Sequence, residues 1–193
     1  MRPRLVLLAS GRGTNLQAVL DAVRQGRLVA EAALVVSDKD SPALERARRA
    51  GVPALFLPKR KGVSREAYDR RLAAFVAAAE PDLVVLAGWM RILSPVFLER
   101  FPGRVINLHP ALPGAFPGLD AIRRSYEAFH RGEVKSGGVM VHRVVPEVDA
   151  GPVVLAEEVP VHPDDTLGSF EARVHEVEHR ILVEAIRRVL GQG

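Results

Sequence analysis

The chain has 193 residues, 48% of them hydrophobic, which predicts one domain with a full apolar core. It contains no cysteine, so disulfides, thiolate metal sites and a cysteine nucleophile are excluded and a cytoplasmic location is expected. The formal charge of +4 is too small to indicate nucleic-acid binding, and no apolar run is long enough to predict a membrane span.

Apolar segments alternate with helical patterns in the first 109 residues. Five short strands rich in apolar residues are expected at 4–9, 32–37, 52–57, 82–88 and 104–109. Four helices are expected between them, at 16–26, 41–51, 64–80 and 94–101. Continuously apolar strands separated by helices are typical of a parallel sheet that is covered on both faces.

The pattern changes after residue 109. A Pro/Gly-rich loop at 110–118 precedes a helix at 119–131, two strands at 137–145 and 151–161, and a long helix at 166–190. The chain shows no internal repeat and no linker. We therefore expect one α/β domain, doubly wound around a mostly parallel, Rossmann-like sheet, with antiparallel C-terminal strands and a long C-terminal helix.

A glycine turn, SGRGTN at residues 10–15, follows the first expected strand. Ligands of such sheets bind beyond the carboxyl ends of the strands, and glycines before a helix N-terminus suit a phosphate. The alternative is a plain turn capped by Thr14 or Asn15. The turn is not a dinucleotide fingerprint, because Leu16 replaces the third glycine. Asp38, however, stands where a ribose-binding acid would be, so a nicotinamide-dependent oxidoreductase remains open.

Asn107 and His109 stand two residues apart at the end of the fifth expected strand. Residues i and i+2 of a strand project from the same face. An imidazole titrates near neutrality and can act as a general acid or base, while an amide N–H can donate to a developing oxyanion. The alternative is a histidine that is satisfied within the core.

Two further segments are candidates for the same site. Asp149, in the loop between the last two strands, could orient or stabilise an imidazolium if it lies near it, or could simply cap its turn. The segment AGWMRILSP at 87–95 offers an apolar wall for a flat aromatic ligand, or ordinary core packing.

The chain resembles the phosphoribosylglycinamide formyltransferase family over nearly its whole length. Seven segments occur in the family's order and spacing: SGRGTNL, SREAYDR, VVLAGWMRILS, NLHPAL, the Pro-Gly pair at 117–118, VDAGPV and ARVHEVEH. The resemblance implies transfer of a formyl group from 10-formyltetrahydrofolate, used as a cosubstrate, to the amine of glycinamide ribonucleotide in de novo purine biosynthesis. It also implies a single formyltransferase domain over 1–193, with a nucleotide-binding half at 1–109 and a half at 110–193 that completes the folate and active sites.

The resemblance implies roles for individual residues. Asn107, His109 and Asp149 would be catalytic. The ribonucleotide would be bound by Gly13, Thr14, Asn15 and Glu178. The folate would be bound by Arg65, Met90, Arg91, Ile92, Leu93 and Asn107. The chain departs from the family pattern in its loop HPALPGAFPG and in GGVMVHRV, where Met140 and Arg143 replace the usual Thr and Phe.

The implied reaction is direct transfer, with no covalent enzyme intermediate and no metal. The expected partners are small molecules, without nucleic acid or membrane, and the expected assembly is a monomer or homodimer. Related enzymes that formylate methionyl-tRNA or hydrolyse formyltetrahydrofolate carry an additional domain, for which 193 residues leave no room. The open alternatives are another enzyme using 10-formyltetrahydrofolate, such as the hydrolase, a nicotinamide-dependent oxidoreductase, and a non-catalytic nucleotide-binding module.

Overall fold

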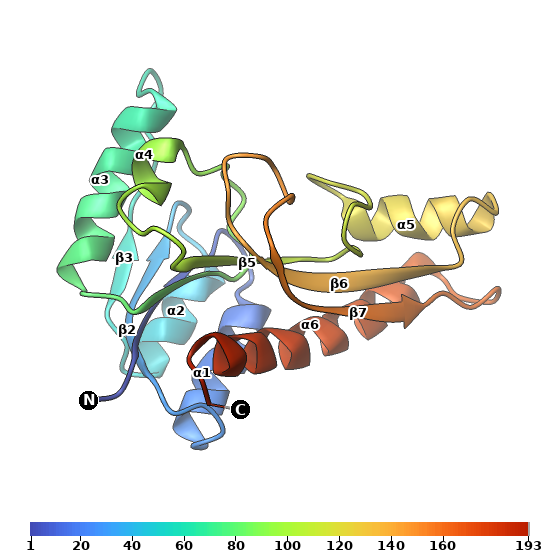
Figure 1. Cartoon of the computed structure of the whole chain (residues 1–193), viewed down its shortest axis with the longest axis horizontal. Coiled ribbons are helices and arrows are strands. Elements are labelled where there is room, and N and C mark those ends of the chain that lie inside the picture. The colour runs from blue at the N-terminus through green and yellow to red at the C-terminus, as the bar shows by residue number, and fades with distance from the viewer. Residues whose placement is uncertain (193) are drawn as a thin grey trace. The chain divides into compact units, whose positions relative to one another are not determined.

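The computed structural model describes residues 1–192, which contain seven strands and six helices (Figure 1). The strands are β1 (Arg4–Leu8), β2 (Glu31–Ser37), β3 (Ala54–Phe56), β4 (Leu83–Leu86), β5 (Val105–His109), β6 (Ser136–Arg143) and β7 (Val153–Pro160). The helices are α1 (Thr14–Arg24), α2 (Pro42–Arg49), α3 (Arg65–Ala78), α4 (Pro95–Leu98), α5 (Ala121–His130) and α6 (Leu167–Val189).

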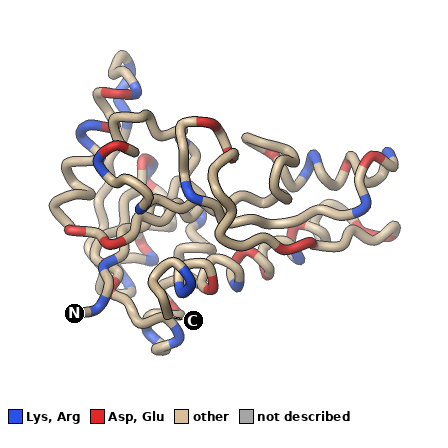
Figure 2. The backbone as a smooth tube through the Cα atoms, in the orientation of Figure 1, with Lys and Arg blue, Asp and Glu red and all other residues tan. Residues whose placement is uncertain are grey.

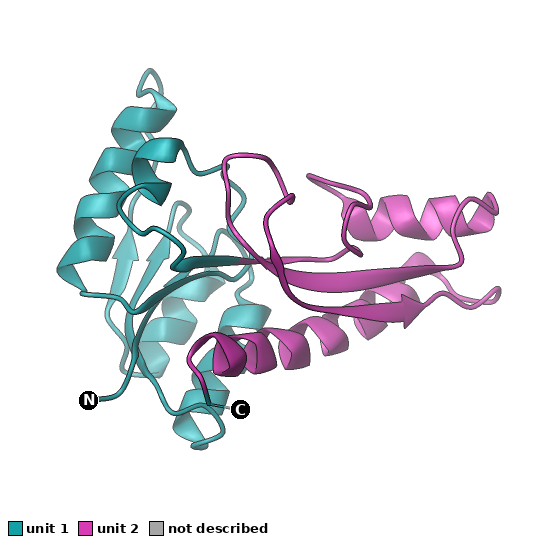
Figure 3. Ribbon diagram, in the orientation of Figure 1, with its two compact units in different colours: residues 1–106, 192 teal, residues 107–191, 193 magenta. Residues whose placement is uncertain are grey.

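The strands form one sheet in the order β3-β2-β1-β4-β5-β6-β7. β1 pairs with β2 and β4 in parallel, and β2 pairs in parallel with β3, whereas β6 and β7 are antiparallel. This arrangement confirms the predicted fold class, a mostly parallel α/β sheet with antiparallel C-terminal strands and a long C-terminal helix. The chain divides into two compact units, residues 1–106 with Gln192 and residues 107–191, and the boundary lies inside β5 (Figure 3).

The first unit holds β1–β4 and α1–α4. Its central strands are apolar apart from Arg4: Leu5 to Leu8 of β1 are fully buried, and β4 is buried along its whole length. In Figure 1, α1 and α2 lie on one side of these strands and α3 and α4 on the other, which is the doubly wound arrangement. The helices bury apolar stripes at helical spacing, such as Leu16, Val19 and Leu20 of α1.

Most predicted elements differ from the structure by one to three residues at their ends, and two of these differences have a clear cause. Helix α1 begins at Thr14, two residues earlier than predicted, and its N-cap is Gly13 with φ 71°, so the expectation of a Thr14 or Asn15 cap is wrong. β4 ends at Leu86 rather than at residue 88, because Gly88 takes a φ of 87° and turns the chain out of the strand. Ser64 caps α3, accepting a hydrogen bond from the N–H of Ala67 at 3.1 Å.

The second unit consists of the β6–β7 hairpin with α5 and α6. Thr166 and Ser169 form a reciprocal capping box at the start of α6. Phe170, one turn into the helix, is fully buried and stacks 6.2 Å from the ring of Tyr126 in α5. A Cβ on Gly137 of β6 would lie only 2.5 Å from the Phe170 ring, so the small residue in the strand makes room for the large one in the helix.

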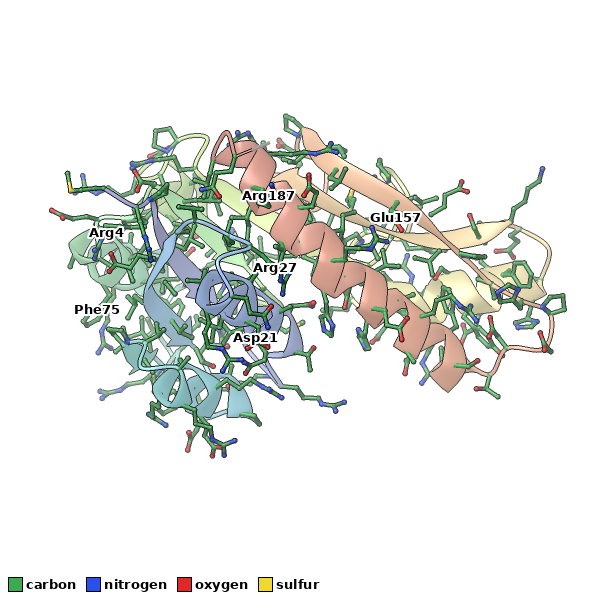
Figure 4. All side chains as sticks on the ribbon, turned by 90° about the horizontal axis from the view of Figure 1, so that it is seen from below. Arg4, Asp21, Arg27, Phe75, Glu157 and Arg187 are labelled. Atoms are coloured by element: carbon green, nitrogen blue, oxygen red, sulfur yellow. The ribbon has the colours of Figure 1, made fainter. Side chains whose placement is uncertain are left out.

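Charged residues are interspersed along both units. Figure 2 shows Lys and Arg alternating with Asp and Glu along the backbone. Several of them form surface ion pairs, such as Arg4 with Glu31 at 2.9 Å, and Glu157 of β7, labelled in Figure 4, with Arg180 of α6. Pairs of this exposed kind each contribute about 0–1 kcal/mol. Among residues 1–192 no helix is both long and apolar enough to cross a membrane.

Candidate active site

Strand β5 carries the two polar side chains that the sequence singled out. Its residues are buried except Asn107, which is partly exposed, and His109 is only 4% exposed. Both side chains contact Asp149. The amide of Asn107 donates to Asp149 Oδ1 at 3.3 Å, and His109 Nδ1 lies 3.4 Å from Asp149 Oδ2. The structure therefore brings together the three residues implied to be catalytic, all within the second unit.

The loop between β6 and β7 holds Asp149 in place. Asp149 takes a left-handed conformation with φ 52°, which Asp tolerates better than most residues. Its Oδ2 accepts a hydrogen bond from the N–H of Gly118 at 2.9 Å. The neck of the loop is closed by the N–H of Arg143, which donates to the carbonyl of Pro152 at 2.9 Å. Gly151 is required at this neck, since a Cβ would lie 1.8 Å from the Arg143 carbonyl oxygen.

His109 faces a hydrogen-bond acceptor on each side of its ring. Nε2 lies 3.1 Å from the carbonyl oxygen of Phe116, and Nδ1 faces the Asp149 carboxylate. Burial lowers the pKa of His109 below its ordinary value of 6.5, although Asp149 and the Phe116 carbonyl act in the opposite direction. The imidazole is therefore mostly neutral near pH 7, with a carboxylate beside it to stabilise the imidazolium when a proton arrives.

Asp149 remains ionised in this site. Burial alone would raise the pKa of its carboxyl group, but the neighbouring His142 ring, the Gly118 N–H and the charge of His109 together hold that pKa below 3.8. A carboxylate that is charged over the whole physiological range is thus in direct contact with both polar residues of β5.

His142 of β6 is the fourth member of the cluster, and the sequence analysis missed it. Its side chain is 2% exposed, and its Nε2 lies 3.2 Å from the amide nitrogen of Asn107. On the other side of the ring, Nδ1 lies 2.9 Å from the carbonyl oxygen of Arg143. The only signal in the sequence is a polar residue inside the apolar run of a strand, and this signal does not identify a partner 35 residues away.

The loop that follows β4 in the first unit carries four of the residues implied to bind folate. Its side chains alternate between buried and exposed: Trp89 and Leu93 are buried, whereas Met90 is 58% and Ile92 is 51% exposed. Three contacts anchor its backbone and its arginine. The N–H of Met90 donates to Ser10 Oγ at 2.9 Å, Arg91 Nε donates to Asp38 at 2.7 Å, and the N–H of Ser94 donates to Asp69 at 2.6 Å. The loop is thus a fixed support for two exposed apolar side chains.

Asp38, the candidate ribose ligand, has a different partner. Its side chain is 1% exposed and binds Arg91, whose guanidinium carbon lies 5.4 Å from the centre of the Tyr68 ring. One carboxylate oxygen is thus held in an internal ion pair, and the other is buried without a hydrogen-bond partner. A buried, paired carboxylate argues against a ribose ligand, the role on which the oxidoreductase alternative depended.

The other implied residues lie at element ends and on a helix. Gly13 precedes α1, and a Cβ there would meet Ala43 at 2.9 Å, so close packing against α2 already requires glycine. Arg65 is the first residue of α3 and is exposed. Glu178 is buried on α6 and pairs with His175 at 2.6 Å. Within residues 1–192 no group of three His, Asp or Glu side chains could hold a metal ion.

Comparisons with known proteins point to one family. The model of the formyl transferase family matches residues 3–186. The chain is 44% identical over 199 residues to phosphoribosylglycinamide formyltransferase of Schizosaccharomyces pombe, covering 96% of both chains, and 43% identical over 178 residues to that of Escherichia coli, covering 92% and 82%.

Solved structures agree with this result. The structure of glycinamide ribonucleotide transformylase 1 from Symbiobacterium toebii superimposes with a TM-score of 0.90 at 47% identity, covering 96% of this chain and 86% of that one. The corresponding protein from Geobacillus kaustophilus gives 0.91 at 37% identity, covering 98% and 100%.

Proposed function

The chain belongs to the formyl transferase family, and we propose that it transfers the formyl group of 10-formyltetrahydrofolate to the amine of glycinamide ribonucleotide in de novo purine biosynthesis. The observation that carries this proposal at the site is the contact of Asn107 and His109 with one buried, ionised aspartate. A general base, a carboxylate that stabilises its protonated form and an amide are the groups that acyl transfer between two nitrogens needs.

The reaction is a direct transfer. The amine of the ribonucleotide attacks the formyl carbon, a new C–N bond forms, and the carbonyl electron pair moves to oxygen. The tetrahedral intermediate then collapses, and the bond between the formyl carbon and the folate nitrogen breaks. One proton must leave the attacking nitrogen, and one must reach the leaving nitrogen, so a single group that accepts and then returns a proton suffices.

His109 is that group. Its lowered pKa keeps the imidazole neutral and able to accept a proton, and Asp149 stabilises the imidazolium until the proton is returned. Beside the Phe116 carbonyl, 3.1 Å away, Nε2 can only donate, so to act it must leave this carbonyl for a substrate nitrogen while the neutral ring carries its hydrogen on Nδ1, towards Asp149. The Phe116 carbonyl therefore occupies a hydrogen-bonding position that a substrate takes over.

Asn107 donates to the oxygen of the tetrahedral intermediate. Both of its amide hydrogens are used inside the protein, one towards Asp149 and one towards His142. One of them must therefore change acceptor. The hydrogen bond to the ionised Asp149 is charge-assisted and roughly twice as strong as a neutral one, so the hydrogen directed at His142 is the one that moves.

The remaining residues bind the two substrates. We assign the folate, the cosubstrate, to Arg65, Met90, Arg91, Ile92, Leu93 and Asn107. The two exposed apolar side chains on the anchored loop suit a flat ring system. We assign the ribonucleotide to Gly13, Thr14, Asn15 and Glu178, because the positive end of the α1 dipole suits a phosphate.

We further propose that residues 1–193 act as one formyltransferase domain, with 1–109 as the nucleotide-binding half and 110–193 completing the folate and active sites. The enzyme would work in the cytoplasm as a monomer or homodimer on small molecules, without a metal, nucleic acid or membrane.

Substitution of the catalytic pair tests the proposal. His109→Ala and Asp149→Asn should each lower turnover by about a hundredfold or more, the scale of general acid–base catalysis, while the circular dichroism spectrum is unchanged. His162→Ala and Asp164→Asn, at exposed positions, are the matched controls and should retain activity. Formyl transfer is followed spectroscopically with and without glycinamide ribonucleotide. Near-normal turnover of either catalytic variant, or folate cleavage without the amine, would contradict the assignment.

A further inference from the structure

We propose that His142 is a positioning residue. As the Nδ1–H tautomer it accepts a hydrogen bond from the Asn107 amide, and it thereby keeps that N–H oriented for the oxygen of the tetrahedral intermediate. The proposal deepens the function proposed above and rests on it. It concerns a side chain that is 2% exposed and whose contacts are all with protein groups.

The tautomer of His142 follows from its partner on one side. Nδ1 lies 2.9 Å from the carbonyl oxygen of Arg143, and a carbonyl oxygen can only accept a hydrogen bond. Nδ1 must therefore carry the hydrogen. In a neutral ring Nε2 then has a lone pair and no hydrogen, so it can only accept.

The orientation of Asn107 follows from that of His142. The end of the amide that lies 3.2 Å from Nε2 must be the NH2 group, because an amide oxygen there would face a lone pair. The same NH2 group lies 3.3 Å from Asp149 Oδ1, another acceptor. Two independent acceptors thus require the same orientation, and together they bind both amide hydrogens.

A protonated His142 does not fit this arrangement. Its Nε2–H could reach Asp149 Oδ1 only at 3.5 Å, and it would point a hydrogen at the NH2 group of Asn107. The Nδ1–H tautomer instead satisfies the two shorter contacts of the ring, as donor to the Arg143 carbonyl and as acceptor from Asn107. In the free enzyme the N–H of Asn107 donates a hydrogen bond to neutral Nε2, which fixes its direction. Because a bond to a neutral acceptor is weaker than one to a charged acceptor, this N–H can change partner to the charged oxygen of the tetrahedral intermediate.

The local backbone directs His142 to this position. The ladder between β6 and β7 shifts register between Val141 and His142, an irregularity of the kind that re-aims side chains beside active sites. The Arg143 carbonyl that sets the tautomer is itself fixed, since Gly151 packs against it and the same residue's N–H bonds Pro152.

The first test is spectroscopic and needs no substrate. Long-range 1H–15N correlation spectra of the uniformly labelled free enzyme report the tautomer of each histidine, with His142→Gln identifying the His142 signals. We expect Nδ1 to be protonated and Nε2 to be unprotonated. Detection of the Nε2–H tautomer, or of an imidazolium, near neutral pH would overturn the proposal whatever the activity of the enzyme.

The second test is kinetic. His142→Leu should lower kcat by about tenfold or more with each KM changed less than about threefold, because the lost interaction acts in the transition state. His142→Gln, which can place an amide oxygen near the position of Nε2, should restore part of kcat. The control is His130→Leu on α5, outside the cluster, which should retain the wild-type kcat.

A double-mutant cycle separates positioning from a general structural effect. In an Asn107→Ala background, His142→Leu should cost less than about twofold, because the residue through which it acts is gone. If His142→Leu costs the same in both backgrounds, His142 does not act through Asn107 and the proposal fails. If the wild-type enzyme transfers no formyl group at all, the proposed function fails instead, and the tautomer measurement still decides the position of the hydrogen.

Discussion

Burial and a neighbouring charge act in opposite directions on the pKa of His109. Burial lowers its pKa below 6.5, and the Asp149 carboxylate is the largest influence that raises it. A base must be neutral to accept a proton, so activity should fall as the pH drops through this lowered pKa. Replacing Asp149 by Asn removes the raising influence. The pKa then falls further, and the acid limb of the pH–kcat/KM profile should move to lower pH in the residual activity of Asp149→Asn.

The matched variant for this measurement is Asp164→Asn. It removes an exposed carboxylate from the same unit, and its acid limb should coincide with that of the wild type. If the acid limb of the profile does not move in Asp149→Asn, the group that titrates there is not His109.

At the residue scale, the sequence predicts part of the cluster. The i, i+2 spacing of Asn107 and His109 places two polar side chains on one strand face, and in the structure both contact the same carboxylate. His142 and the carbonyl of Phe116 could not be found in this way. Their contacts depend on a register shift and on a loop conformation, neither of which leaves a periodic pattern in the sequence.

The loop between β6 and β7 is the element that depends most on a single small residue. Gly151→Ala should destabilise the protein by about 2–3 kcal/mol, because the new Cβ would overlap the Arg143 carbonyl oxygen, a backbone atom that cannot move independently. Activity should fall more than stability alone explains, since the same shift displaces Asp149. Urea unfolding and formyl-transfer assays on one preparation measure both effects.

Gly168 in the first turn of α6 is a suitable control for Gly151→Ala. Its φ is not in the left-handed region, and a Cβ would make only an ordinary contact at 3.8 Å with Thr166. Gly168→Ala should therefore be neutral or stabilise the protein by up to about 1 kcal/mol through helix propensity. A Gly151→Ala protein as stable as the wild type would show that the neck of the loop can open.

At the element scale, helices and buried strands were the predictable part. Apolar segments and helical patterns located them, because those signals are local. Element ends were less predictable. Gly13 starts α1 because it packs against Ala43 of α2, a contact between segments 30 residues apart in the sequence that no local rule contains.

The whole molecule should lose stability in two steps as the pH falls. The pKa values of His109 and His179 are lowered by burial, so the folded state binds a proton less readily than the unfolded chain. Their contribution is complete above about pH 6.5 and is lost as the pH falls through the folded pKa values. The pKa values of Asp149 and Asp165 are also lowered, and their contribution is lost below about pH 4.

Urea unfolding monitored by circular dichroism at several pH values measures this dependence. The free energy of unfolding should decline as the pH falls below about 6.5, and the decline should be smaller in His109→Gln, which has no titrating ring. It should decline again in the acid range. A free energy of unfolding that is constant from about pH 7 to pH 5 would contradict the first step.

The fold as a whole could be predicted because its strands and helices alternate and because its parallel strands are mostly apolar. That pattern leaves few arrangements other than a doubly wound sheet. The division inside β5 could not be predicted to the residue, since β5 reads as one continuous strand and the boundary depends on how contacts are distributed in space.

The anchored loop after β4 determines how the protein can recognise a ligand. Ser10, Asp38 and Asp69 fix its backbone and arginine, so the backbone that carries Met90 and Ile92 is in place before any ligand arrives. Little ordering entropy remains to be lost on association, which favours affinity for a ligand of the right shape. The same stiffness prevents the loop from adapting to ligands of another shape, so this part of the protein should be selective rather than promiscuous.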